Sequence, residues 1–124
     1  MGELRYFFDT YALYEFVNGN VNYKKYFENY DIILTRLNLV EIFYVLLKDF
    51  NLNIARKYCD YFKAFMIEFS EEVLEKAMVF KLKNKDKKLS YIDCIGYQYA
   101  LSKNLKFLTG DIKFKNFKNV EYVK

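Results

Sequence analysis

The chain has 124 residues, of which 53% are hydrophobic, with 13 Tyr, 13 Phe and a net charge of +4. This length and apolar content predict one domain with a buried core over residues 1–124, and they exclude a disordered chain. Residues 76–124 carry 12 Lys/Arg against 4 Asp/Glu, which fits a polyanionic partner, although solubility and a biased codon pool explain the excess equally well.

Strand and helix patterns alternate along the chain. The expected strands are short apolar runs, at residues 4–8, 31–35, 66–69, 105–109 and 120–123. The expected helices lie between them, at residues 10–16, 23–30, 36–49, 53–65, 70–83 and 90–103, with a turn or short helix near 111–116. Helix 36–49 shows the amphipathic spacing in Leu37, Val40, Tyr44 and Leu47. Repeated strand–helix–strand units with short connections predict an α/β fold, a central parallel sheet of four to five strands covered by helices on both faces.

Several protein classes are excluded by what the sequence lacks. Two cysteines, Cys59 and Cys94, are too few for a disulfide framework, and without histidine there is no Cys/His zinc site and no base to activate a thiol. No apolar run approaches the length of a membrane span, and strand-like residues begin too early to leave room for a signal peptide. We therefore expect a cytoplasmic protein with no membrane association.

Four acidic residues stand where an acid is locally unfavourable. Asp9 and Asp111 each follow an expected strand, and parallel sheets form their sites at the carboxyl ends of strands. Glu41 lies on helix 36–49 between Leu37 and Val45, and Asp93 opens an apolar helix. Converging carboxylates repel one another unless a cation offsets their charge. A hard divalent ion such as Mg²⁺ binds carboxylates, activates water and stabilises charge on a phosphate, so the set predicts a metal-dependent phosphodiesterase.

Each acid also has a purely structural explanation. Asp9 and Asp111 are placed to cap a helix or turn, and Asp93 is placed to form a capping box with Ser90. Glu41 is the hardest to explain in this way, because a surface helix should keep that position apolar unless a partner such as Arg36 or Arg5 satisfies the acid. Gly96, one turn after Asp93, predicts that another element or a ligand approaches closely.

Four short motifs, in order along the chain, resemble those of the PIN-domain nucleases. They are Tyr6-Phe7-Phe8-Asp9-Thr10, Asn38-Leu39-Val40-Glu41-Ile42, Ser90-Tyr91-Ile92-Asp93 followed by Ala100, and Leu108-Thr109-Gly110-Asp111-Ile112-Lys113-Phe114. The size and the lack of appended domains resemble the VapC-type toxins of toxin–antitoxin pairs. The resemblance implies a PIN-like three-layer fold and a Mg²⁺- or Mn²⁺-dependent endoribonuclease acting on RNA. It also implies a homodimer and a small antitoxin whose C-terminal segment covers the active-site groove.

The resemblance implies roles for individual residues. The catalytic and metal-holding residues would be Asp9, Glu41, Asp93 and Asp111, with Thr10, Thr109 and Ser90 as second-tier candidates. Three basic residues flank the expected active-site helices and are candidates for RNA phosphate contacts, although solvated lysines are more common: Arg36, Lys87 and Lys88. Tyr11 departs from the family pattern, where a small polar residue follows the motif, so we expect it to narrow or reshape the site.

Two other functions remain open at this point. One is a non-catalytic domain of the same fold that binds RNA or a protein partner. The other is a phosphoacceptor signalling domain, which also uses acids at strand ends. The latter needs an acid pair at the end of the first strand, and Glu3 precedes that strand instead.

Overall fold

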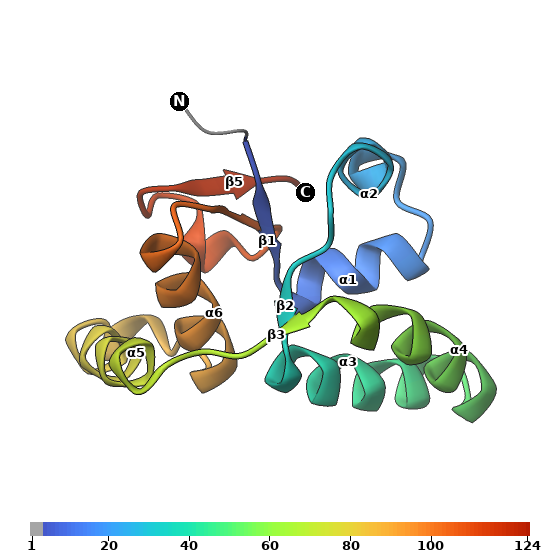
Figure 1. Ribbon diagram of the computed structural model, residues 1–124, viewed down its shortest axis with the longest axis horizontal. Helices are drawn as coiled ribbons and strands as arrows, with labels where there is room; N and C mark the ends of the chain where they lie inside the picture. Colours follow the sequence, from blue (N-terminus) through green and yellow to red (C-terminus); the bar gives the residue numbers. More distant parts are fainter. Residues whose placement is uncertain (1–3) are drawn as a thin grey trace.

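The computed structural model describes residues 4–124 and contains five short parallel strands. They are β1 (Tyr6–Phe8), β2 (Leu34–Thr35), β3 (Met66–Ile67), β4 (Lys106–Thr109) and β5 (Val120–Tyr122). One sheet has the order β1-β4-β5, and β2 pairs with β3. The Phe8 amide donates a 2.9 Å hydrogen bond to the Ile33 carbonyl, which links the two sets and leaves β1 at the centre (Figure 1). The predicted parallel α/β fold is confirmed.

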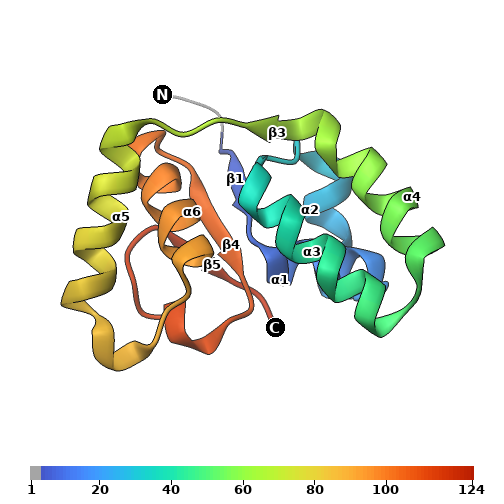
Figure 2. The same cartoon turned by 90° about the horizontal axis from the view of Figure 1, so that it is seen from below.

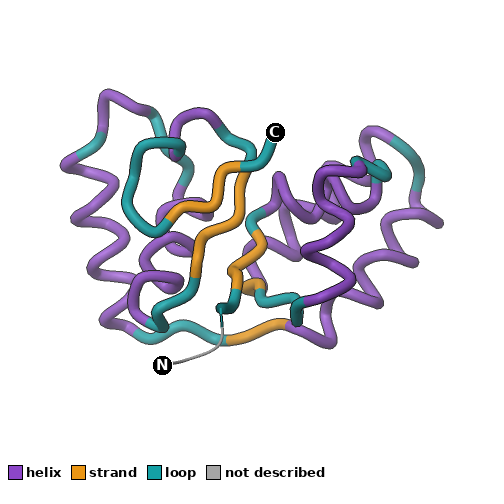
Figure 3. Tube along the Cα trace, turned by 90° about the horizontal axis from the view of Figure 1, so that it is seen from above, coloured by secondary structure: helices purple, strands orange, loops and turns teal. Residues whose placement is uncertain are grey.

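Helices lie on both sides of these strands. The α-helices are α1 (Thr10–Val17), α2 (Lys24–Asn29), α3 (Arg36–Asp49), α4 (Leu52–Phe62), α5 (Glu71–Lys83) and α6 (Tyr91–Ser102). Single 3₁₀ turns are η1 (Val21–Tyr23), η2 (Lys63–Phe65), η3 (Lys85–Lys87) and η4 (Ile112–Phe114). Helices α5 and α6 lie side by side across the strands from α3 and α4 (Figures 2 and 3). Over residues 4–124, none of these helices has the length and apolar character needed to cross a bilayer.

Side-chain caps fix where the longer helices begin. Asp9, Thr35, Asn51, Ser70 and Ser90 each accept a hydrogen bond from a backbone N–H of the first helical turn. These caps satisfy amide groups that have no partner within the helix. The sequence-predicted helix starts therefore agree with the structure to within about one residue, inside the usual uncertainty of helix ends.

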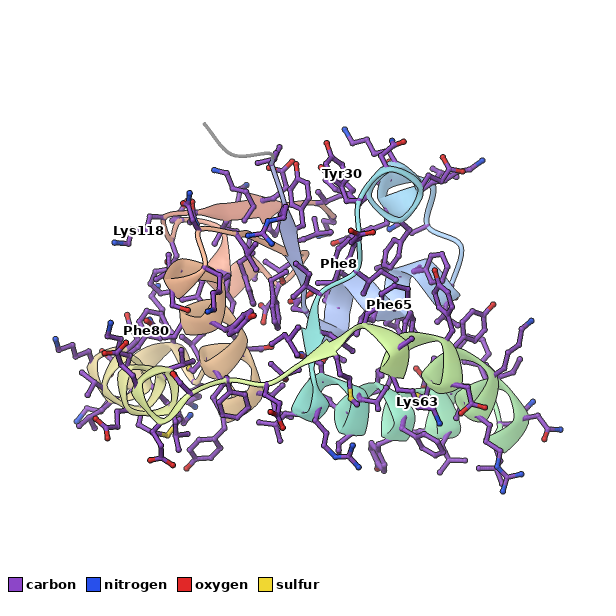
Figure 4. The ribbon with its side chains drawn as sticks, in the orientation of Figure 1. Phe8, Tyr30, Lys63, Phe65, Phe80 and Lys118 are labelled. Atoms are coloured by element: carbon purple, nitrogen blue, oxygen red, sulfur yellow. The ribbon has the colours of Figure 1, made fainter. Side chains whose placement is uncertain are left out.

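The core has two parts that share β1. Phe7 and Phe8 are both fully buried, but successive strand residues point to opposite faces, so each belongs to a different apolar cluster. Phe8 packs with residues of α1, α3 and α4, and Phe7 packs with residues of α5, α6 and β4. Figure 4 shows Phe8 on one side of the molecule and Phe80 on the other. The two parts of the fold are thus joined through one buried strand.

The structure corrects the predicted face of α3. Val40, Tyr44 and Leu47 have exposed fractions of 61%, 64% and 42%, so the stripe used to recognise the helix faces solvent. The buried face is instead formed by Asn38, Ile42 and Leu46. The helix carries two apolar stripes, and the stripe that contacts the core through Ile42 and Leu46 is the one that becomes buried.

Gly96 permits the close approach of α6 to β1 that the sequence predicted. A Cβ atom at this position would lie 2.7 Å from Cε1 and 3.0 Å from Cζ of the Phe7 ring. Such contacts are far shorter than the separation of about 3.5–4.0 Å that carbon atoms prefer. The same helix carries Asp93 one turn earlier, so this packing also sets the distance between Asp93 and the end of β1.

We predict that Gly96→Ala lowers the free energy of unfolding by about 1–3 kcal/mol, because the added methyl group meets the buried Phe7 ring. At an open helical position the same change would be stabilising. Urea denaturation measures the effect. The matched control is Gly96→Ala in a Phe7→Leu background, where the ring edge is gone and the substitution should be neutral or stabilising. An equal loss in both backgrounds would contradict this explanation.

Candidate active site

The four acids singled out in the sequence line one cavity of about 690 Å³. Asp9 follows β1, Asp111 lies just after β4, Glu41 is on α3 and Asp93 is in the first turn of α6. The cavity is also lined by Thr10, Tyr11, Tyr14, Glu15, Val45, Gly110, Ile112, Tyr122 and Lys124. It therefore opens at the carboxyl ends of β1 and β4, where ligand sites of parallel sheets form.

Asp9 is the most deeply placed of the acids, with 2% of its surface exposed. Its Oδ1 accepts a 2.8 Å hydrogen bond from the Ala12 amide and so caps α1. Burial raises the pKa of Asp9 well above 3.8, and the nearby Asp93 and Asp111 carboxylates raise it further. Hydrogen bonds from the Thr109 hydroxyl and the Ala12 amide lower it in part. Asp9 is thus both a helix cap and a member of the acid cluster.

Asp93 is the electrostatic link between the acids. Burial raises its pKa from 3.8 to about 6, and Glu41 and Asp111 add to this increase. A hydrogen bond with Ser90 and the charge of Lys113 oppose it. Ser90 caps α6 by accepting a 3.0 Å hydrogen bond from the Asp93 amide, which fixes where this acid stands. Asp93 is therefore close enough to Asp9, Glu41 and Asp111 for their charges to repel.

Thr109 connects the two acids at the strand ends. Its Oγ1 accepts a 3.0 Å hydrogen bond from the Asp111 amide, and its hydroxyl also bonds to Asp9. Asp111 in turn caps η4, with Oδ1 accepting a 3.0 Å hydrogen bond from the Lys113 amide. The capping roles of Asp9 and Asp111 are real, and each uses one carboxylate oxygen of an acid that also lines the cavity.

Glu41 has no basic partner in the described chain. None of the ion pairs formed by residues 4–124 includes Glu41, so neither Arg36 nor Arg5 neutralises it. Its position on the cavity wall, half-buried, places it against Asp93 instead. Glu41 and its helical neighbours Leu37 and Val45 are all half-buried, so the unusual feature of Glu41 is the absence of a basic partner among the described residues and not a fully buried helix face.

Asn38 is a structural residue of the site that the sequence argument did not single out. It is fully buried, and its Oδ1 accepts hydrogen bonds of 3.0 Å and 2.8 Å from the Thr35 amide and hydroxyl. Its Nδ2 donates a 3.2 Å bond to Thr10 Oγ1. Asn38 thereby ties the start of α3, which carries Glu41, to the start of α1, which Asp9 caps. The Thr35-to-Asn38 spacing of a capping box was the available signal.

The three basic residues proposed for substrate contact lie outside the cavity. Arg36, Lys87 and Lys88 are exposed, at the start of α3 and in and just after η3. The cations closer to the acids are Lys124, which lines the cavity, and Lys113, whose charge acts on Asp93. Sequence position gave no signal for Lys124, because the chain end reaches the site only in the folded structure, whereas Lys113 lies two residues after Asp111.

Two further residues shape the cavity. Glu15 on α1 adds a fifth acid to the wall and accepts a 3.0 Å hydrogen bond from Asn20 Nδ2. Tyr11 covers Gly110, because a Cβ atom at Gly110 would lie only 2.1 Å from Cε1 of its ring. Tyr11 therefore forms an aromatic wall of the cavity against the residue before Asp111.

The chemistry of these residues fits a hard divalent cation. The donors are carboxylate oxygens, and burial together with mutual repulsion makes their negative charge unfavourable without a counter-ion. In their present conformation, residues 4–124 contain no three His, Cys, Asp or Glu side chains arranged to hold a metal ion.

We predict that the metal-free protein is destabilised by these acids as pH rises. The pKa values of Asp9 and Asp93 in the folded protein lie above 3.8, the ordinary value for an Asp side chain. Both acids therefore favour the folded state when they are protonated, below about pH 4. For Asp93 this contribution to the free energy of unfolding is lost as pH rises through about 6. Asp93→Asn has no proton to lose. It should match the wild type near pH 4 and exceed its free energy of unfolding by about 1–2 kcal/mol at neutral pH.

Urea denaturation across this pH range, in the presence of a chelator, measures the difference. The control is Asp49→Asn. Hydrogen bonds from Lys48 and Tyr14 lower the pKa of Asp49, so the wild type gains stability from this carboxylate as pH rises to about 4, and above that pH the variant should be less stable than the wild type by a constant amount. A difference between wild type and Asp93→Asn that does not change with pH would contradict the repulsion described here.

Solved structures with the same fold include proteins of toxin–antitoxin systems. The VapBC2 structure from Rickettsia felis, bound to a DNA fragment from its promoter, has a chain 21% identical to this one, with a TM-score of 0.74 over 97% of this chain and 98% of that one. A toxin–antitoxin complex from Klebsiella pneumoniae gives 18% identity and a TM-score of 0.71 over 96% of each chain. PAE2754 from Pyrobaculum aerophilum gives 18% identity and a TM-score of 0.68 over 97% of this chain and 91% of that one. At these identities the likeness shows the fold.

Sequence comparison identifies the family. No curated protein matches the chain significantly. The family model of the PIN domain matches residues 6–120, which include all four acids. Since this match takes in nearly the whole chain, the protein belongs to the PIN domain family.

Proposed function

We propose that this protein is a divalent-metal-dependent endoribonuclease that hydrolyses RNA phosphodiester bonds. The observation that carries the proposal is the group of four mutually repelling carboxylates, Asp9, Glu41, Asp93 and Asp111, around one cavity. PIN domains are generally nucleases, and PIN-domain nucleases generally use divalent metal ions. Residues 1–124 would act as one catalytic domain.

The four acids would hold Mg²⁺ or Mn²⁺ through carboxylate oxygens. When bound, such an ion lowers the pKa of water and offsets negative charge on the attacked phosphate. Thr109 holds Asp9 and Asp111 in place through its two hydrogen bonds, and Ser90 fixes the start of the helix that carries Asp93. Asn38 orients Thr10 and the first turn of α3. These supports would hold the elements that carry the acids around the cavity before substrate arrives.

We further propose that the enzyme is the toxin of a VapBC-type toxin–antitoxin system, acting in the cytoplasm and inhibited by a small antitoxin. The similarity in fold to chains of the Rickettsia felis and Klebsiella pneumoniae complexes supports this reading. The protein also has an exposed apolar surface on and beside α3, formed by Val40, Tyr44, Leu47, Phe50 and Leu52. Apolar surface of this kind is typical of protein interaction sites, so it is available for a homodimer or an antitoxin.

We predict Mn²⁺- or Mg²⁺-dependent cleavage of RNA by the wild type, with activity at least about 100-fold lower in Asp9→Asn and in Asp93→Asn. Loss of a residue that only supports a metal ligand reduces activity by about 10–100-fold, and loss of the ligand should exceed this. Cleavage of a labelled single-stranded RNA, with and without chelator, measures the effect. Asp49→Asn changes an acid outside the cavity and should cleave like the wild type.

One observation favours a second function. As the side chains stand, residues 4–124 form no three-residue metal cluster, which fits a PIN-like domain that binds RNA or protein without cleaving it. In that case the wild type and both acid variants would give the same slow, chelator-insensitive background. That result would overturn the nuclease proposal in favour of a binding module.

A further inference from the structure

We propose that Tyr11 and Tyr122 form a subsite that stacks one unpaired nucleobase of single-stranded RNA, next to the phosphate held at the acids. The proposal rests on the nuclease function for the position of that phosphate. Tyr11 and Tyr122, the aromatic wall of the cavity, would contact the substrate, and that substrate would be single-stranded RNA.

The cavity is larger than the acids require. Its volume of about 690 Å³ falls within the range of about 300–1,000 Å³ typical of pockets for small organic ligands. Asp9, Glu41, Asp93 and Asp111 share it with three tyrosines and with apolar side chains. A phosphodiester bound at the acids would therefore carry its neighbouring nucleotide into contact with aromatic and apolar surface.

Tyr11 is held in place by the backbone of the site. Its ring lies against Gly110, which has no side chain to obstruct it, and its ring centroid is 6.3 Å from that of the fully buried Tyr23. Tyr23 is itself anchored, since its hydroxyl donates to the Val123 carbonyl. Tyr11 remains half-buried and lines the cavity, so it is a rigid aromatic surface beside Asp9 and Asp111.

Tyr122 reaches the same cavity from β5. Its backbone pairs in register with Thr109, the residue that bonds to both strand-end acids. The Lys115 ammonium lies 5.2 Å from the centroid of the Tyr122 ring, and Lys124 lines the cavity two residues further on. Aromatic surface and cations thus occur together on the side of the cavity formed by β5 and the chain end.

This combination fits a single strand better than a duplex or a peptide. Proteins that bind single strands pair cationic groups for the phosphates with aromatic side chains on which bases stack. In a double helix the bases are stacked on one another and unavailable to Tyr11 or Tyr122. A purely apolar peptide would leave the lysines and the acid cluster without a role. We therefore infer that Tyr11 and Tyr122 contact a base of single-stranded RNA.

Leucine and phenylalanine substitutions at Tyr11 and Tyr122 test the subsite. Leucine keeps apolar volume but removes the π-face, whereas phenylalanine keeps the face. With a short single-stranded RNA and Mn²⁺, Tyr11→Leu and Tyr122→Leu should each raise KM about 5- to 100-fold, the loss expected for one stacked base, with a smaller change in kcat. Tyr11→Phe and Tyr122→Phe should retain wild-type KM. Tyr61→Leu, at an exposed tyrosine outside the cavity, is the matched control and should behave like the wild type.

An abasic substrate makes the test specific. RNA that lacks the base beside the cleaved bond should raise KM for the wild type by a similar factor, and the leucine variants should show no further increase. Thermal melting of each variant checks the fold. Equal KM for wild type and both leucine variants would overturn the subsite while leaving the nuclease function intact. Unchanged KM together with weaker self-association of Tyr11→Leu would also overturn it, in favour of a protein contact.

Failure of the nuclease function gives a different pattern. If the wild type cleaves no RNA, fluorescence anisotropy with the same labelled RNA decides the subsite on binding alone. Weaker binding by the leucine variants than by the phenylalanine variants would support the stacking of a base. Equal binding by all variants would overturn it.

Discussion

Repulsion between carboxylates at the ends of β1 and β4 is the main physical constraint on this structure. Burial and neighbouring charge raise the pKa of Asp9 and Asp93, so the folded chain holds acids where ionisation is unfavourable. A protein that needed only stability would have apolar or amide side chains there. The arrangement is explained if a cation offsets the charge when the site is at work.

The fold fixes the acids through helix starts. Asp9 and Asp111 each use one carboxylate oxygen to cap the element that follows, and the Ser90 cap fixes the first turn that contains Asp93. Capping and metal binding are therefore compatible uses of the same residue, since a carboxylate has further lone pairs to offer. Gly96 completes the arrangement by letting α6 lie directly against Phe7 of β1.

Local signals explain how much of this could be predicted from the sequence. Helix α3 was predicted with its observed bounds from the spacing of its apolar residues, and the Thr35 cap explains why it begins at Arg36. The positions of Asp9 and Asp111 followed from the strands before them. The buried face of α3 was predicted wrongly, because its two apolar stripes are alike in sequence and only contact with the core distinguishes them. Asn38, Glu15 and Lys124 reach the site through tertiary packing, which leaves little or no local signal.

Direct measurement of Mn²⁺ binding tests the central claim that these acids are placed for a cation. Electron paramagnetic resonance of free Mn²⁺ gives the affinity for the wild type, Asp9→Asn and Glu41→Gln without any need for catalysis. The wild type should bind Mn²⁺ more tightly as pH rises through about 6, where Asp93 loses its proton, and each variant should bind at least about 10-fold more weakly. Equal, pH-independent binding by all three proteins, or none by the wild type, would contradict the claim.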